Sequence, residues 1–332
     1  MAIWQSELDR LAAETNFSGV VRVDRDGQVE LAKAYGFAHR GYEIPNEVDT
    51  RFAIASGMKG LTALTVVSLI ESGELNLANT ARSVIGADLP LIDDAVTIEH
   101  LLAHRSGIGD YLDEDSDLDL NDYLMPGSAH AFAETEQFLD WLDGHPTKFR
   151  PDEGFGYCNG GYVVLALIVE RASGIPFHDL VMEKVCDPAG MKDTAFLRSD
   201  ELPGRTALGY VDPIGARTNV FHLPVRGNGD GGIYSTVADM SSFWTAFLSG
   251  RIVPDEWVEE MIRPRSEGEG GWHYGLGFWL QPSTNAPTLE GSDTGVSFRS
   301  VHDPSRDLTY TVISNTTEGA WPVTKLLAES LN

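Results

Sequence analysis

Residues 56–70 read SGMKGLTALTVVSLI, in which a Ser-x-x-Lys tetrad opens an almost continuous apolar run. Side chains three positions apart on a helix lie on one face, so the Lys59 amino group can reach the Ser56 hydroxyl. Residues 61–70 are apolar nearly all round, which is typical of a helix buried inside a domain. We therefore expect a buried helix with a serine and a lysine at its start.

This pair has the composition of an activated nucleophile. A serine hydroxyl is a weak nucleophile at neutral pH, and burial lowers the pKa of a lysine so that its neutral amine can accept the serine proton. Ser-x-x-Lys also occurs by chance at the end of a helix that carries a surface lysine. The apolar run favours the catalytic interpretation, because a polar group in such surroundings is costly unless it is paired or functional.

A second polar group, Tyr157-Cys158-Asn159, ends a loop rich in Gly and precedes an apolar segment at residues 160–172. A loop next to a rigid element can direct side chains into a cleft. A tyrosine near an ammonium ionises more easily and can act as an acid or a base, and Asn159 offers donors and an acceptor to a polar substrate. Such a triplet is also common in ordinary loops.

Composition narrows the class of protein. The chain has 332 residues, of which 42% are hydrophobic, enough for one large domain or two interleaved ones. A net charge of -26 argues against nucleic-acid and membrane partners, which need clustered Lys and Arg. The first residues lack the pattern of a signal peptide, no apolar run is long enough for a membrane span, and Cys158 and Cys186 offer no disulfide framework. We expect a cytoplasmic protein.

Both ends of the chain predict sheet elements, and the middle predicts helices. The expected elements are a helix to about Thr15, a hairpin of residues 20–23 and 29–35, strands at 274–280, 296–302 and 308–314, a closing helix at 321–331, and central helices at 160–172 and 237–248. The predicted fold class is therefore α+β. A mostly antiparallel sheet is built from residues 1–78 and 263–332, a mainly helical region of residues 79–262 is inserted, and the active cleft lies between them.

Taken together, Ser56-x-x-Lys59 and Tyr157-x-Asn159 resemble the serine β-lactamase-like superfamily, in its branch of class C β-lactamases, D-alanyl-D-alanine carboxypeptidases, D-aminopeptidases and related esterases. Further segments match that family in the same order: TIEHLLAHRSGI at 97–108, DPAGM at 187–191, GGIYSTVADM at 231–240 and VISN at 312–315. The resemblance covers most of the chain and implies one β-lactamase-like domain.

The resemblance also implies roles for these residues. Ser56 would be the acylated nucleophile, Lys59 and Tyr157 would share the proton transfers, and Asn159 would hold the substrate or orient Lys59. Two backbone N–H groups, one at Ser56 and one on a strand that bears a third motif, would form an oxyanion hole. Each such donor is typically worth ~3 to 4 kcal/mol. No metal or organic cofactor is implied, and acylation followed by attack of water would complete the cycle.

The third motif is where this chain departs from the family, which has Lys or His, any residue, then Gly. The best match is Leu289-Glu290-Gly291, followed by Ser292. Gly291 permits close backbone approach, and the Ser292 N–H can complete the oxyanion hole. Leu289 removes the cation that would bind a substrate carboxylate, which disfavours β-lactams and peptides that end in D-alanine. A neutral ester or amide is the expected substrate.

We therefore expect a serine hydrolase, in the first place a carboxylesterase that acts on small esters or amides. A D-amino-acid peptidase or carboxypeptidase, or a weak β-lactamase, is the alternative within the hydrolases. A ligand-binding pseudoenzyme of the same fold is the alternative without catalysis, because a scaffold can lose its chemistry and keep a pocket. The presence of all four residues of the first two motifs favours the enzyme.

Two other patterns have a structural and a ligand-binding interpretation. His100 and His104, four apart on an expected helix, could bind a metal, but the glutamate of the H-E-x-x-H motif is absent. The acidic segment 113–122 lacks the glycine and glutamate of an EF-hand loop, so a solvated loop is favoured over a calcium site. We expect this segment and residues 198–228 to form walls of the active cleft.

Overall fold

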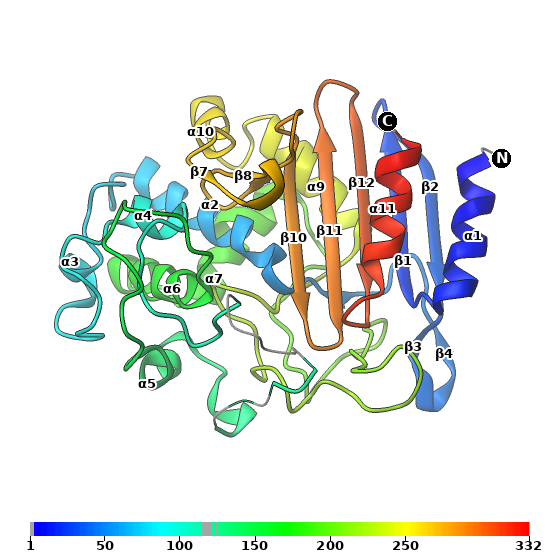
Figure 1. Ribbon diagram of the computed structural model, residues 1–332, viewed down its shortest axis with the longest axis horizontal. Helices are drawn as coiled ribbons and strands as arrows, with labels where there is room; N and C mark the ends of the chain where they lie inside the picture. Colours follow the sequence, from blue (N-terminus) through cyan, green and yellow to red (C-terminus); the bar gives the residue numbers. More distant parts are fainter. Residues whose placement is uncertain (1–2, 115–120, 124, 126, 332) are drawn as a thin grey trace.

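The structure is a computed structural model that describes residues 3–114, 121–123, 125 and 127–331. Its centre is a sheet of eight described strands in the order β2-β1-β12-β11-β10-β9-β8-β7, and every neighbouring pair is antiparallel (Figure 1). The strands are β1 (Gly19–Arg25), β2 (Gln28–Tyr35), β7 (Ser266–Glu267), β8 (His273–Tyr274), β9 (Trp279–Leu280), β10 (Pro287–Asp293), β11 (Val296–Asp303) and β12 (Leu308–Ser314).

The two ends of the chain meet in this sheet, as predicted. β1 pairs with β12, with Val20 opposite Ile313 and Val21 opposite Val312. Because side chains alternate along a strand, Val20 and Ile313 belong to the core on one face, and Val21 and Val312 to the core on the other. The apolar residues of these strands are therefore buried on both sides, which fixes their register.

Helices cover both faces of the sheet. Helix α1 (Ile3–Thr15) and helix α11 (Ala320–Ser330) pack on each other and share one core cluster with Val21 and Val312 (Figure 1). Helix α9 (Val237–Leu248) packs against β12 and β1, where Phe243 joins the core on the other face. Helix α9 comes from the predicted insert of residues 79–262. The division of the chain at residues 78/79 and 262/263 stays a prediction.

The helical region lies beside the sheet, and helix α2 (Met58–Glu71) connects the two, because it packs on β10 as well as on α6 and α7 (Figure 1). The other α-helices of the helical region are α3 (Arg82–Ile85), α4 (Ile98–Leu102), α5 (Leu139–Leu142), α6 (Asn159–Ser173), α7 (Phe177–Val181), α8 (Asp187–Ala189) and α10 (Asp255–Met261). Short strands pair as β3 (Phe37–His39) with β4 (Ile44–Pro45) and β5 (Phe52–Ala53) with β6 (Tyr234–Ser235).

The central helices match the sequence prediction closely, since α6 and α9 cover residues 160–172 and 237–248. Among the described residues, no single helix is long and apolar enough to cross a membrane. One bent pair, Asn159–Ser173 with Phe177–Ala189, meets that test by length and composition, with 89° between its two parts.

The predicted continuous strand at residues 274–280 is wrong. The segment forms β8 and β9 with a turn between them, in which the Gly275 N–H donates to the Phe278 carbonyl at 2.9 Å. Gly277 adopts a φ of 89°, a conformation that favours glycine. The alternation of apolar residues resembled a strand because Tyr274, Leu276 and Phe278 are all buried, although the backbone reverses between them.

Candidate active site

The Ser-x-x-Lys tetrad begins in a 3-10 turn, Ala55–Gly57, that leads directly into α2. Ala55 has a φ of 45°, which is costly for a residue with a side chain and is a form of strain that gathers at functional sites. A Cβ on Gly57 would lie 2.4 Å from the Phe298 ring, so the turn can pack on β11 only with glycine there. Ser56 is therefore held at the entrance of α2.

Lys59 is buried beneath Ser56, with 1% of its surface exposed. Its Nζ donates to Ser56 Oγ at 2.8 Å, to Asn159 Oδ1 at 2.8 Å and to the Asp230 carbonyl at 2.9 Å. Burial lowers the pKa of Lys59, although the nearby carboxylates of Asp230 and Glu114 act in the opposite direction. The direction expected from the apolar sequence around Lys59 is confirmed, and a neutral amine is accessible at lower pH than for an ordinary lysine.

Asn159 is the first residue of α6, and its whole side chain is engaged. Its Oδ1 accepts from Lys59, and its Nδ2 donates to the Leu112 carbonyl at 3.2 Å and to Glu114 Oε1 at 2.9 Å. These three bonds place the amide with its oxygen toward the lysine. Of the two roles implied for Asn159, orientation of Lys59 is the one that these contacts supply.

Asp110 holds the start of α6 and was not singled out in the sequence. Its carboxylate accepts the N–H of Asn159 at 2.6 Å and the N–H of Gly160 at 2.8 Å, which satisfies two free donors of the helix terminus. Burial raises the pKa of Asp110 to about 6. Asn159 and Gly160 follow Asp110 by 49 and 50 positions in the chain, so no local spacing could have revealed these two contacts.

Tyr157 lies over the same lysine, with Lys59 Nζ 4.9 Å from the ring centroid. Its ring stacks on Trp279 at a centroid distance of 5.8 Å and an angle of 13°. Burial raises the pKa of Tyr157 well above its usual value, the Glu114 carboxylate adds to this, and a hydrogen bond with Ser56 lowers it only in part. The net shift is therefore opposite to the easier ionisation that we expected from the lysine, because burial disfavours the charged phenolate.

His104 lies under Tyr157 and does not share a helix face with His100. Helix α4 ends at Leu102, and His104 follows it with a φ of 54°. The His104 Nδ1 accepts the Cys158 N–H at 3.1 Å, and its ring lies 4.3 Å from the Tyr157 ring. The expectation of two histidines in one helical row is therefore wrong, since the helix is shorter than the motif.

The structure gives no support for a metal site at the histidine pair or at the described part of the acidic segment 113–122. In the part of the chain that the structure describes, no group of three His, Cys, Asp or Glu side chains is placed to hold a metal ion. Residues 115–120 of the acidic segment lie outside the described residues. At its start, Asp113 pairs with Lys148 at 2.6 Å.

The third motif lies on β10 against the turn Ala55–Gly57 that contains Ser56. A Cβ on Gly291 would lie 2.5 Å from the Ser56 nitrogen, so only glycine allows this approach. Leu289, 2% exposed, points at α2, and a Cβ on Gly60 would lie 2.5 Å from its Cδ2. Position 289 therefore supplies no cation to the site. Arg299 on β11 lies opposite Glu290 and forms an ion pair with it.

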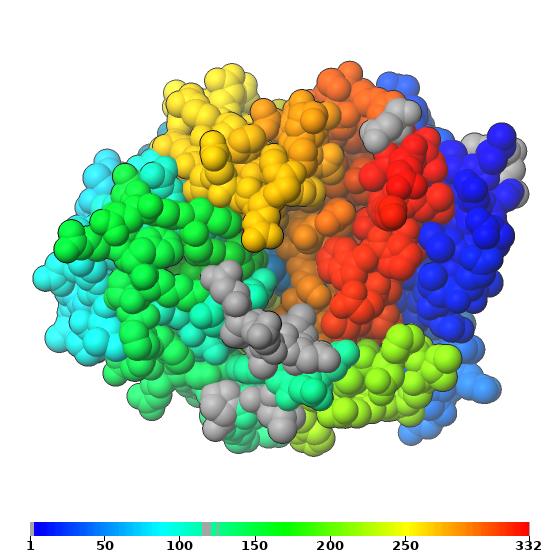
Figure 2. Space-filling model, in the orientation of Figure 1, coloured from blue at the N-terminus to red at the C-terminus, as the bar shows by residue number. Residues whose placement is uncertain are grey.

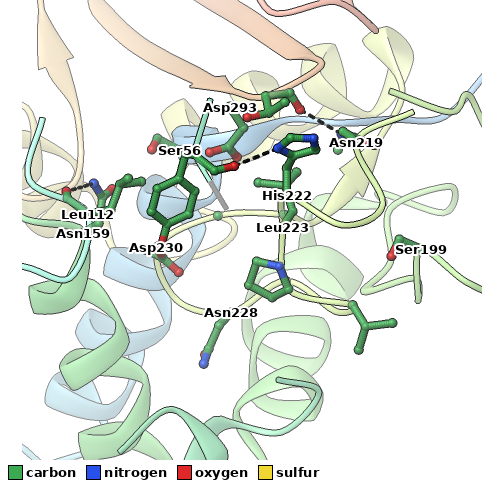
Figure 3. A pocket seen from close by; sticks show the side chains of 18 of the residues that line it. Ser56, Leu112, Asn159, Ser199, Asn219, His222, Leu223, Asn228, Asp230 and Asp293 are labelled. Atoms are coloured by element: carbon green, nitrogen blue, oxygen red, sulfur yellow. Dashed lines mark hydrogen bonds between the residues drawn. The ribbon is translucent and has the colours of Figure 1, made fainter. Parts of the chain in front are cut away.

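Two cavities meet at Ser56, and Figure 2 shows the surface hollowed between the helical region and the orange strands of the sheet. The first cavity, drawn in Figure 3, is lined by Ser56, Tyr111, Asn159, Asp230, Asp293 and residues of the segment 197–228, among them Ser199, Asn219, His222, Leu223 and Asn228. The second is lined by Ser56, Leu112, Glu114, Phe155, Tyr157, Glu269, Trp272, Trp279, Glu290, Gly291, Ser292 and Arg299, so Glu114 of the acidic segment also contributes to a wall. The expectation that residues 198–228 form a wall is confirmed.

Comparison with known proteins agrees with this geometry. The family model described as Beta-lactamase matches residues 4–329. The chain belongs to the beta-lactamase family. The chain is similar to a solved structure of a penicillin binding protein from Bacillus halodurans, with a TM-score of 0.91 and 33% sequence identity. The match covers 98% of this chain and 100% of that chain.

Two relatives have names that state different activities. Esterase EstB from Burkholderia gladioli is 32% identical over 61% of this chain and 53% of its own length. A D-aminopeptidase from Brucella anthropi is 30% identical over 69% of this chain and 42% of its own length. The chain spans less than two thirds of the length of these beta-lactamase-family relatives.

Proposed function

We propose that the protein is a serine hydrolase that forms an acyl-enzyme on Ser56 and acts as a carboxylesterase on small esters or amides. The observation that carries the proposal is the contact of 2.8 Å between Lys59 Nζ and Ser56 Oγ, made by a lysine whose pKa burial lowers. A base must lie within hydrogen-bond reach of the proton that it removes, and it works best when its pKa is close to the working pH.

In acylation, Lys59 takes the Ser56 proton while Oγ forms a bond to the substrate carbonyl carbon. The oxyanion that develops is held by the N–H groups of Ser56 and Ser292, which the close approach of Gly291 to Ser56 brings to one place. The bond from carbon to the leaving group then breaks, Tyr157 gives that group a proton, and the proton held by Lys59 restores Tyr157. Water repeats the sequence on the ester of Ser56 and releases the acid.

The division of labour between Lys59 and Tyr157 follows from their surroundings. Burial lowers the pKa of Lys59 and raises that of Tyr157, so at neutral pH the lysine is the better base and the tyrosine keeps its proton. Two groups whose pKa values are displaced in opposite directions are suited to act as base and acid. Tyr157 is therefore the proton donor to the leaving group.

The substrate class is supported by two observations. Leu289 faces α2 and supplies no cation. Arg299 on the next strand is paired with Glu290, so neither residue offers an unpaired cation to a substrate carboxylate. The relatives named as an esterase and a D-aminopeptidase support an ester or an amide. The D-aminopeptidase, at 30% identity, makes D-amino-acid amides and peptides the second candidate.

The experiment is pre-steady-state release of p-nitrophenol from p-nitrophenyl butyrate by the wild type and by Ser56→Ala, with the intact-protein mass recorded during the reaction. We expect a burst of one equivalent and a butyryl adduct in the wild type, and neither in the variant. No burst and no adduct in the wild type, with a β-lactam also failing to label it, would refute the hydrolase and favour a ligand-binding protein.

A further inference from the structure

The two cavities differ in which proton-transfer group they contain. Tyr157 lines the second cavity and not the first, whereas Asn159 lines the first and not the second. The group that protonates the leaving atom must lie within hydrogen-bond reach of it. With Tyr157 as the proposed proton donor, the leaving group is assigned to the second cavity, against Trp272 and Trp279, and the acyl group to the first.

The acyl cavity has an acidic wall. Asp230 and Asp293 line it, and no Lys or Arg is among the described residues that do so. Asp293 ends β10 two residues after Gly291, and its Oδ2 lies 3.7 Å from a Cβ built on Gly231, the neighbour of Asp230. Figure 3 shows both carboxylates around the cavity that Ser56 enters. They are thus close to the carbonyl carbon that Ser56 would attack.

Burial raises the pKa of Asp293 to about 7 and raises that of Asp230, so a bound cation would favour the ionised form of both groups. The Asp230 carboxylate accepts a hydrogen bond from the neutral Tyr111 hydroxyl, and within the described part of the chain the Asp293 carboxylate has no hydrogen-bond or ion-pair partner. The Lys59 amino group contacts Ser56 Oγ, Asn159 Oδ1 and the Asp230 carbonyl, and it forms no ion pair with either of these carboxylates. An enclosed carboxylate without a partner is costly, and a ligand cation would remove that cost.

We infer that the acyl group of the substrate carries a positively charged amine close to its carbonyl carbon, and that Asp293, with Asp230 beside it, binds this amine. The substrates are then aminoacyl esters or amides. The inference rests on the proposed function, because it takes Ser56 as the acylated residue. Charge-assisted hydrogen bonds to a carboxylate are stronger than neutral ones, so the pair would select these acyl groups over neutral ones of the same shape.

The experiment compares two esters of equal size, alanine methyl ester in both enantiomers and methyl 2-methylpropanoate, in which a methyl group replaces the ammonium. At pH 7 the amine is largely charged, since α-amino groups have pKa values of about 7.7 to 8.0. We expect kcat/KM, followed in a pH-stat, to favour one alanine ester by at least about tenfold, or ~1.4 kcal/mol. Asp293→Asn should lower this ratio by about tenfold, and added salt should lower it in the wild type.

The ratio separates recognition of charge from a general loss of structure, which would lower turnover of both esters alike. Glu259→Gln removes an exposed carboxylate of α10 that lines neither cavity, and this variant should keep the wild-type ratio. Equal kcat/KM for the two esters, or an unchanged ratio in Asp293→Asn, would overturn the inference. Acylation of Ser56 by p-nitrophenyl butyrate without turnover of alanine methyl ester would also overturn it and leave the proposed function intact. Absence of any Ser56 adduct would end both.

Discussion

The contact between Gly60 and Leu289 decides which face of β10 meets α2, and a double-mutant cycle on this pair tests it. Leu289 is 2% exposed, so Leu289→Ala should cost ~3 kcal/mol within the usual range for such truncations. Gly60→Ala would place a methyl carbon 2.5 Å from Leu289 Cδ2, where carbon atoms prefer about 3.5 to 4 Å. That overlap should cost ~2 kcal/mol, of which ~1 is recovered because alanine favours the helix.

The two single changes therefore predict a summed loss of ~4 kcal/mol if they act independently. In the double variant the new methyl group occupies space that Leu289 leaves, so the overlap disappears and the helix gain of ~1 kcal/mol remains. The double variant should lose only ~2 kcal/mol, which gives a coupling energy of ~2 kcal/mol between the two positions.

The free energy of unfolding is measured for the four proteins by urea denaturation, followed by tryptophan fluorescence and by circular dichroism. Coincident curves are needed before a two-state free energy is assigned. The control pairs Gly60→Ala with Leu327→Ala, a buried residue of α11 in the other core cluster, and should be additive. Additivity within ~0.5 kcal/mol for Gly60 and Leu289 would refute the register of β10, because a slip of one residue turns Leu289 to the other face. Gly291 would then no longer lie beside Ser56.

The other predictions concern the proton-transfer groups. Lys59→Ala and Tyr157→Phe should each reduce kcat/KM for p-nitrophenyl butyrate by orders of magnitude, as members of one catalytic unit do, and a near-normal rate in Lys59→Ala would contradict its role as base. Glu114→Gln keeps an oxygen that can accept from Asn159 but removes a negative charge that raises the pKa of both Lys59 and Tyr157. Loss of that charge lowers both pKa values, so the ascending limb of kcat/KM against pH should move to lower pH, and a shift to higher pH would refute the assignment.

Local patterns predicted much of the fold and the centre of the site. The spacing of Ser56 and Lys59, together with an apolar run longer than a strand, was enough to predict a buried helix with both polar groups at its start. The alternation in residues 308–314 predicted β12 to the residue. The same reasoning failed at residues 274–280, because three buried side chains at alternate positions do not show that the backbone turns at Gly277.

The electrostatics of the site could not be predicted from single residues. The pKa of Tyr157 depends on how completely the surrounding rings exclude water, and its sequence neighbours say nothing about Trp279. Asp110 holds the start of α6 from a loop about 50 residues away, and Asp293 meets Asp230 across the cavity only because β10 and the loop before β6 converge there. These contacts join distant segments, so they exist only in the folded chain.

The sequence by itself determined that Ser56 and Lys59 lie together at the start of a buried helix, and it determined most of the surrounding elements, because helix periodicity and strand alternation are local properties of the chain. Tertiary structure alone decided that Leu289 faces α2, that Arg299 is paired with Glu290, and that two carboxylates line the cavity beside Ser56. The physical reason is that burial and charge depend on neighbours in space, and a pKa or a binding preference is set by how those neighbours exclude water and place their charges.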